Sequence, residues 1–194
     1  MLPEIIFVII SILIAITFHE ATHAYIAYKF GDPTAKMEGR LSLNPLRHLD
    51  PIGTLALIFV HIGWGKPVPV NPNNLQHPSR DNFLISIAGP ASNLVLAVIG
   101  ALLIRLFLHV PVLYSFFSVF VVMNVFLAVF NLLPIPPLDG SKIWHLFLSD
   151  ESYYSLERIG PFILIAFLVF SYSAGGFLIN FISFVSEKII GLIT

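Results

Sequence analysis

Phe18-His19-Glu20-Ala21-Thr22-His23 closes an apolar run, Ile5 to Ile16, that has the composition of a membrane-spanning helix. Two histidines four residues apart lie on one face of a helix, so both imidazoles can reach one metal ion. Glu20 lies beside them, where a general base for a metal-activated water belongs. Ionisable side chains within a membrane helix cost about 3 kcal/mol each on insertion scales, which argues for a functional role. We therefore interpret the stretch as a metal site rather than a chance match.

The composition places the whole chain in a membrane. Of its 194 residues 57% are hydrophobic and 11% are charged, and the mean hydropathy is +0.88. A soluble domain has about 25% charged residues, so these values predict an integral membrane protein. A net charge of -1 gives no basic surface for nucleic acid. The lack of cysteine excludes disulfides and thiolate ligands, which leaves His, Asp and Glu as metal ligands.

The segments long and apolar enough to cross about 30 Å of hydrocarbon are 3–29, 82–108, 111–133 and 160–185. Met1-Leu2-Pro3-Glu4 lacks a basic n-region, so the first is expected to be a retained helix rather than a signal peptide. A shorter apolar run, Ile52 to Ile62, is bracketed by Pro and Gly and cannot span as a helix. We expect a re-entrant segment at about 51–65, within a single all-α polytopic membrane domain, 1–194.

Basic residues predict the orientation. One side of this four-span arrangement carries eight basic residues: Lys29, Lys36, Arg40, Arg47, Lys66, Arg80, Lys142 and Arg158. The other side carries Arg105 and Lys188. By the positive-inside rule the loops 29–81 and 134–159 are cytoplasmic and both termini lie outside. The compartment we expect is the plasma membrane of a prokaryote, with the active site open toward the cytoplasm.

Two segments have the pattern of short edge strands. Gly39-Arg40-Leu41-Ser42-Leu43-Asn44 and Lys66-Pro67-Val68-Pro69-Val70-Asn71 alternate apolar residues with polar residues or proline. They predict a small membrane-associated β-sheet, and the alternative is an irregular, proline-rich loop.

A catalytic zinc usually has three protein ligands, so a third is needed beside the two histidines. Asp139 differs from the other candidates because it follows the apolar helix 111–133 and the break Pro134-Ile135-Pro136-Pro137. Membranes tolerate such a break where the freed backbone groups meet protein or water. The alternative role for Asp139 is the N-cap of a short helix at 140–148.

Two motifs together resemble the site-2 protease family of intramembrane zinc metalloproteases. They are His19-Glu20-Ala21-Thr22-His23 followed by Ala27, and Asn131-x-x-Pro134-x-x-x-Leu138-Asp139-Gly140. Gly89-Pro90-Ala91-Ser92-Asn93 is similar to the family's glycine-rich motif that ends in asparagine. The resemblance implies that His19, His23 and Asp139 bind one Zn²⁺ and that Glu20 is the base. The chain resembles the minimal, core-only members without a PDZ domain.

Asn93 is the remaining catalytic candidate. Counted from the cytoplasmic helix ends, His19 and Asn93 both lie about 15 Å deep. The carboxamide of Asn93 can therefore hold a substrate carbonyl or the oxyanion, or it can bond one helix to another. His48, Asp50 and His61 flank the apolar run 52–62 and can approach the site, but solvation or interfacial hydrogen bonds are the favoured explanation for them.

The expected activity is hydrolysis of peptide bonds in or near transmembrane segments of membrane proteins, as in regulated intramembrane proteolysis. Its partners are transmembrane or membrane-anchored substrates and the lipid bilayer. A substrate helix hides its carbonyls, and the segments 39–44 and 66–71 offer edges on which it can unwind and add as a strand. The alternatives are a metal-binding transporter or sensor, and a catalytically inactive scaffold. A transporter needs polar residues across the full thickness of the membrane, which the outer halves of these helices lack.

Overall fold

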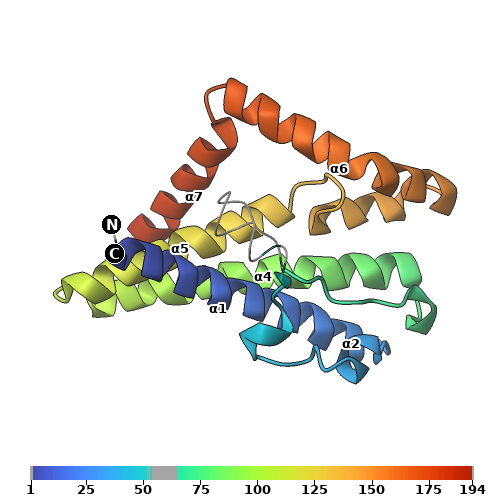
Figure 1. Cartoon of the computed structure of the whole chain (residues 1–194), viewed down its shortest axis with the longest axis horizontal. Coiled ribbons are helices and arrows are strands. Elements are labelled where there is room, and N and C mark those ends of the chain that lie inside the picture. Colours follow the sequence, from blue (N-terminus) through green and yellow to red (C-terminus); the bar gives the residue numbers. More distant parts are fainter. Residues whose placement is uncertain (1, 52, 54–64, 194) are drawn as a thin grey trace.

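The computed structural model describes residues 2–51, 53 and 65–193 (Figure 1). Their helices are α1 (Leu2–Lys29), α2 (Thr34–Met37), η1 (Pro45–Arg47), η2 (Pro72–Asn74), α4 (Pro78–Leu106), α5 (Pro111–Asn131), η3 (Asp139–Leu146), α6 (Asp150–Ser173) and α7 (Phe177–Ile193). Four of them, α1, α4, α5 and α6, are long and apolar enough to cross a membrane. The expectation of a helical membrane protein is confirmed.

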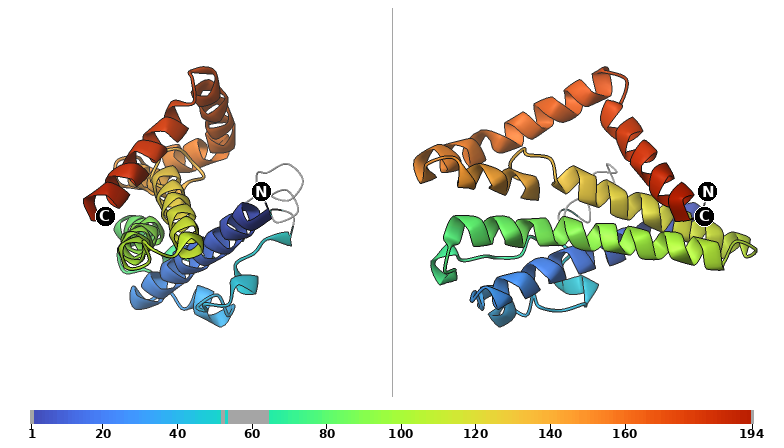
Figure 2. Two further views of the ribbon diagram at one scale, coloured as in Figure 1. Left: turned by 90° about the vertical axis from the view of Figure 1, so that its left-hand side faces the viewer. Right: turned by 180° about the vertical axis from the view of Figure 1, so that it is seen from behind.

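Helices α1, α4 and α5 run alongside one another and form the bundle that carries the site (Figures 1 and 2). Small residues allow this close packing, as they do between membrane helices generally. The buried face of α4 repeats every four residues, through Ile85, Gly89, Asn93, Ala97 and Ala101. A Cβ atom on the neighbouring Gly100 would lie 2.9 Å from a ring carbon of Phe120. The backbone of α4 at Gly100 therefore lies directly against the Phe120 ring of α5.

The predicted single span 160–185 is wrong. Helix α6 ends at Ser173, and the chain turns at Gly175 and Gly176, which have φ angles of +79° and +71°. The Ser171 side chain accepts a hydrogen bond from the Leu178 amide and ties the two helices at the turn. Figure 1 shows α6 leading away from the bundle and α7 returning to it, so that both chain ends lie at the same end of the molecule. Continuous hydropathy conceals such a turn, because two glycines interrupt the helix without adding polarity.

The expected β-sheet at 39–44 and 66–71 is also wrong, because both segments have irregular backbone and the described residues contain no strand. An isolated bridge joins Leu49 and Gly65. The amides and carbonyls of 66–71 bond mainly to side chains instead of to a second strand, as described below. Of the segment expected to be re-entrant, 51–65, the structure describes only Pro51, Gly53 and Gly65, and residues 52 and 54–64 lie outside the described residues.

Residues Lys66–Asn71, here called the strap, run as an extended segment from the bundle toward η2 (Figure 1). Asp32 fixes the far end of the strap, because its buried carboxylate accepts hydrogen bonds from the Asn71 amide (2.8 Å) and the Asn74 side chain (2.8 Å). Burial raises the pKa of Asp32, but the hydrogen bonds from Asn74, Thr34 and Asn71 outweigh it and leave the pKa below its ordinary value. Asp32 is therefore a charged anchor of the strap.

Candidate metal centre

His19, His23 and Asp139 meet in the structure. The Nε2 atoms of His19 and His23 lie 3.0 and 3.2 Å from the same carboxylate oxygen of Asp139, Oδ2. All three side chains offer ligand atoms within 4.8 Å of one another. Both histidines are buried, and the carboxylate of Asp139 is 21% exposed. Residues 120 positions apart in the sequence thus supply a compact set of two nitrogens and one oxygen.

The second nitrogen of each imidazole is held by an acceptor. Nδ1 of His19 lies 2.7 Å from Oδ1 of Asn93, and Nδ1 of His23 lies 2.7 Å from the backbone carbonyl of Ile85. Since carbonyl oxygens only accept, both Nδ1 atoms donate and both Nε2 atoms keep a free lone pair. Metal-ligating histidines are oriented in this way. The donor set and its tautomers therefore fit a Zn²⁺ ion, for which imidazole and carboxylate are usual ligands.

Two glycines make room for these ligands. A Cβ atom on Gly89 would lie 2.3 Å from Nε2 of His23 and 2.8 Å from Nε2 of His19, so α4 can face both imidazoles only without a side chain there. A Cβ atom on Gly140 would lie 2.2 Å from the carbonyl oxygen of Leu132. The residue after Asp139 must therefore be glycine for the chain to fold back against the end of α5.

Asn93 is more fully buried than a side chain that contacts the substrate would be. It has no exposed surface, and its Nδ2 donates to the Ala15 carbonyl (3.0 Å) and to Oδ1 of Asn124 (3.1 Å). Its Oδ1 is already bonded to His19. The side chain thus joins α1, α4 and α5, and these contacts favour the helix-to-helix alternative over contact with substrate.

Glu20 extends from α1 toward the strap. Its Oε2 accepts a hydrogen bond from the Val68 amide, 2.9 Å away. Glu20 and His23 line the same cavity, so the carboxylate lies beside the metal-binding cluster without belonging to it.

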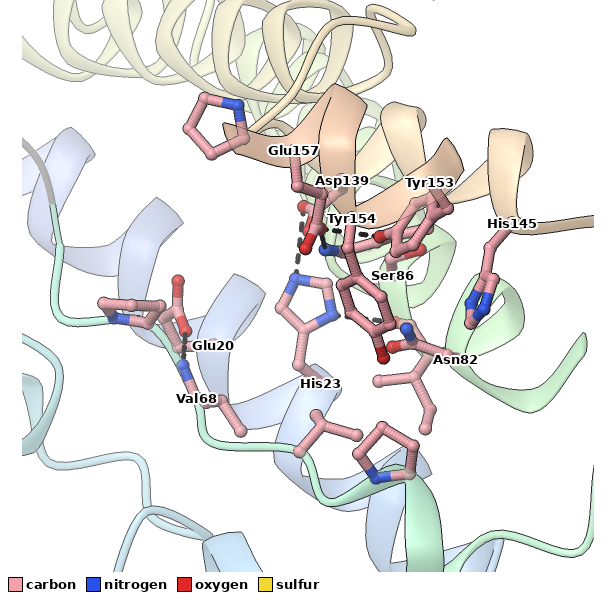
Figure 3. A pocket seen from close by; sticks show the side chains of 16 residues that line it. Glu20, His23, Val68, Asn82, Ser86, Asp139, His145, Tyr153, Tyr154 and Glu157 are labelled. Atoms are coloured by element: carbon pink, nitrogen blue, oxygen red, sulfur yellow. Dashed lines mark hydrogen bonds and ion pairs between the residues drawn. The ribbon is translucent and has the colours of Figure 1, made fainter. Parts of the chain in front are cut away.

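The cavity has a volume of about 350 Å³ and is enclosed by three parts of the chain. Figure 3 shows His23 and Asp139 between Glu20 and Val68 on one side and Tyr153, Tyr154 and His145 on the other. The strap contributes Pro67, Val68 and Val70, and η3 with α6 forms the opposite wall. Backbone, carboxylate and metal-binding groups thus face one space that is large enough for a short stretch of peptide.

The wall formed by η3 and α6 was not expected from the sequence. Lys142 forms an ion pair with Glu157, and the Tyr153 hydroxyl donates to the same carboxylate at 2.6 Å. We call these three residues the α6 latch, since they join α6 to η3, the segment that begins at Asp139. The four-residue spacing of Tyr153 and Glu157 was a usable signal for one helix face, but nothing in the sequence paired that face with Lys142.

The other flanking candidates do not join the cluster. The buried His48 bonds through Nε2 to the Ser42 carbonyl at 2.7 Å, and Asp50 accepts from the Gly53 amide at 2.7 Å. His61 lies outside the described residues. Among the part of the chain that is described, the cluster that could hold a metal consists of His19, His23 and Asp139.

Comparison with known proteins gives a consistent set of relatives. Residues 107–171 match the model of peptidase family M50. A Bacillus subtilis protein, "Putative zinc metalloprotease YwhC", is 46% identical over 146 residues, which are 71% of this chain and 67% of that protein. "Putative zinc metalloprotease Rip2" of Mycolicibacterium smegmatis is 35% identical over 84% of this chain and 67% of its own length. No solved structure matches the chain at a significant level.

Proposed function

Since the chain belongs to peptidase family M50, the site-2 proteases, and is an intramembrane zinc metalloprotease, we propose that His19, His23 and Asp139 hold its zinc and that Glu20 is its general base. The observation that carries this proposal is the convergence of both Nε2 atoms on one oxygen of Asp139 while both Nδ1 atoms donate elsewhere. An N-cap role alone for Asp139 would not require two buried imidazoles to face it.

The protein's own groups account for the proton transfers. Bound zinc supplies Lewis acidity, which lowers the pKa of a water molecule and polarises a peptide carbonyl. Glu20 has one carboxylate oxygen, Oε2, bonded to the Val68 amide, which leaves Oε1 to accept the proton of the attacking water. The same oxygen then returns the proton to the leaving amine. Asn93 keeps His19 in the ligating tautomer and in our proposal is a positioning residue rather than a group that touches the substrate.

The strap is the proposed binding edge for an unwound substrate. Its amides are largely committed: Lys66 donates to His48, Val68 to Glu20 and Asn71 to Asp32. Pro67 and Pro69 have no donor. Among the described residues the Val70 amide has no recorded partner, so an added peptide would bond mainly by donating to strap carbonyls. The substrates we propose are transmembrane or membrane-anchored proteins whose backbone amides become free where their helix unwinds.

The proposed orientation follows the positive-inside rule, with the loops 29–81 and 134–159 in the cytoplasm of a prokaryotic cell and both termini outside. Cysteines at the exposed Met37 and Gln76 test it, because the native chain has none. Both should react with an impermeant reagent applied from the cytoplasmic side. Reaction from opposite sides would contradict the proposed topology.

Paired substitutions test the proposed chemistry. In Glu20→Gln the ligands remain, so the purified protein should keep its zinc but lose cleavage of a transmembrane reporter by about 100-fold or more. Asp139→Asn keeps the capping ability of the side chain and removes its charge, so it should lose most of its zinc as well as its activity. Near wild-type cleavage by Glu20→Gln would contradict the mechanism. Full zinc and activity in Asp139→Asn would remove Asp139 from the ligand set.

A further inference from the structure

Arg40 is a buried cation outside the motifs described above. Its side chain is 3% exposed, and its guanidinium donates to two consecutive carbonyls of the strap, those of Lys66 and Pro67. Within the described part of the chain no carboxylate lies within ion-pair distance of it. Burial lowers the pKa of Arg40, and the more distant charges of Glu20 and Glu38 oppose that shift. A buried guanidinium without a close counter-ion is costly, which indicates a specific role.

The two carbonyls bound by Arg40 directly precede the amide that holds Glu20. Arg40 contacts Lys66 and Pro67, and the next residue, Val68, donates its amide hydrogen to Oε2 of Glu20 at 2.9 Å. Asp32 anchors the other end of the strap through the Asn71 amide. The position of the Val68 amide is thus fixed from both sides by buried charged side chains.

We propose that Arg40 is a positioning residue for Glu20, which acts through the strap by holding the Val68 amide against one carboxylate oxygen. The inference rests on the role of Glu20 proposed above. A planar fork of donors suits two successive carbonyls, whereas a lysine ammonium is a single point charge on a flexible stem. With Oε2 held, Oε1 keeps a fixed direction toward the cavity. Small displacements of a catalytic group lower the reaction rate by large factors, so we expect the bond between the Val68 amide and Glu20 to affect kcat.

The first experiment measures kcat, KM and bound zinc for the purified full chain acting on a single-span transmembrane reporter. Arg40→Gln keeps one donor group and loses the fork and the charge, so kcat should fall about 10- to 100-fold. Zinc content should equal that of the wild type because the ligands remain. The fall in kcat should exceed any rise in KM, since Asp32 still holds the substrate-binding strap at Asn71. Arg40→Lys should recover part of the lost kcat. Arg47→Gln, an exposed arginine on η1, is the matched control and should behave as the wild type.

The second experiment separates positioning from a general structural role. Val68→Pro removes the amide hydrogen that Glu20 accepts while leaving Arg40 in place, and it should lower kcat by a similar factor. In the double variant Arg40→Gln/Val68→Pro the losses should not multiply, because both changes break one connection. If Arg40→Gln does not fold, Val68→Pro and Arg40→Lys carry the test.

Wild-type kcat in Val68→Pro or Arg40→Gln, a change in KM alone, or fully multiplicative losses would each overturn the inference. Activity of Glu20→Gln tests the proposed role of Glu20 separately from the role of Arg40. An active Glu20→Gln chain would refute the role of Glu20 itself. An inert Glu20→Gln chain beside a fully active Arg40→Gln chain would refute only the role of Arg40.

Discussion

The α1–α4–α5 bundle and the α6–α7 pair are both apolar and helical, yet they are held in different ways. In the most apolar window of α4, 39% of the residues are buried, against 11% in that of α6. The buried face of α4 consists mainly of small residues and Asn93, whereas α6 buries only Tyr153, Gly160 and Ser171. Since lipid is as apolar as leucine, hydrophobicity by itself does not hold membrane helices together. Small residues and polar bonds hold the bundle, and α6 has few of either.

This difference has a consequence for the site. The bundle supplies His19, His23 and the bonds that fix their tautomers, while α6 reaches the cavity only near its first turns, through the latch. At Gly160 a Cβ atom would lie 2.3 Å from the Cβ of Pro136, so the N-terminal half of α6 also packs closely on the segment that leads to Asp139. Changes at bundle positions that contact the ligands should therefore affect zinc binding, and changes in α6 and α7 should affect turnover or stability only.

The largest effect is expected for Gly89→Ala in the bundle. The new methyl group would overlap both imidazoles, because its Cβ would lie 2.3 Å from Nε2 of His23 and 2.8 Å from Nε2 of His19. Zinc affinity and reporter cleavage should each fall by about 100-fold or more. Gly100→Ala on the same helix is the control: it crowds Phe120 and should lower stability while leaving zinc in place. A Gly89→Ala chain with normal zinc would show that the bundle is more adaptable than its packing indicates.

A smaller loss of zinc is expected for Asn93→Leu. The change removes the acceptor of His19 Nδ1 but no ligand, so zinc affinity should fall about 10- to 100-fold, the usual range for such partners of a ligating histidine. Asn124→Leu removes the acceptor of Asn93 Nδ2 and a hydrogen bond to the Phe120 carbonyl within α5, but leaves the bond between Asn93 and His19, so it should have a weaker effect in the same direction. Equilibrium zinc titration of the purified proteins measures both. An equal or larger loss of zinc affinity in Asn124→Leu would mean that the contacts within α5, rather than the bond between Asn93 and His19, maintain the metal site.

The sequence predicted the bundle and the metal cluster far better than the rest. His19 and His23 were identifiable from their spacing on one helix, and Asp139 joined them through the resemblance to the site-2 proteases; the structure brings the three together. The three apolar runs of the bundle end close to where its helices end. The turn at Gly175 and Gly176 was missed because hydropathy does not register backbone geometry. The strap alternates like a strand, but its amides bond to Glu20 and Asp32, which no pattern in its own sequence reveals. Asn93 was expected at the level of His19, which the bond between them supports, but of its two expected roles the buried bonds favour helix-to-helix contact over contact with substrate.

A moderate effect on turnover is expected where α6 meets the site. Glu157→Gln keeps the size of the side chain and removes the charge that pairs with Lys142 and accepts from Tyr153. A partly exposed ion pair contributes about 1 kcal/mol or less, so reporter cleavage should fall only a few-fold and zinc content should not change. Glu151→Gln, at an exposed position on the same helix, should have no effect. Loss of zinc in Glu157→Gln would mean that the latch supports Asp139 directly and would weaken the contrast between the two regions.

The smallest effect on the site is expected at the turn between α6 and α7. Gly176 has a φ of +71°, and a Cβ atom there would meet nothing within 4 Å, so Gly176→Ala adds backbone strain without a steric clash. A left-handed conformation costs a non-glycine residue about 1–2 kcal/mol, which should lower the thermal midpoint by a few degrees in detergent. Zinc content and kcat should stay at their wild-type values, because the turn lies far along the chain from the ligands and the latch. Gly191→Ala, within helix α7 and also free of close contacts, lacks the positive φ and should not lower the midpoint at all. If Gly176→Ala reduced cleavage while zinc stayed bound, the turn as well as the latch would orient α6. The α6–α7 pair would then contribute to catalysis and not only pack against the bundle.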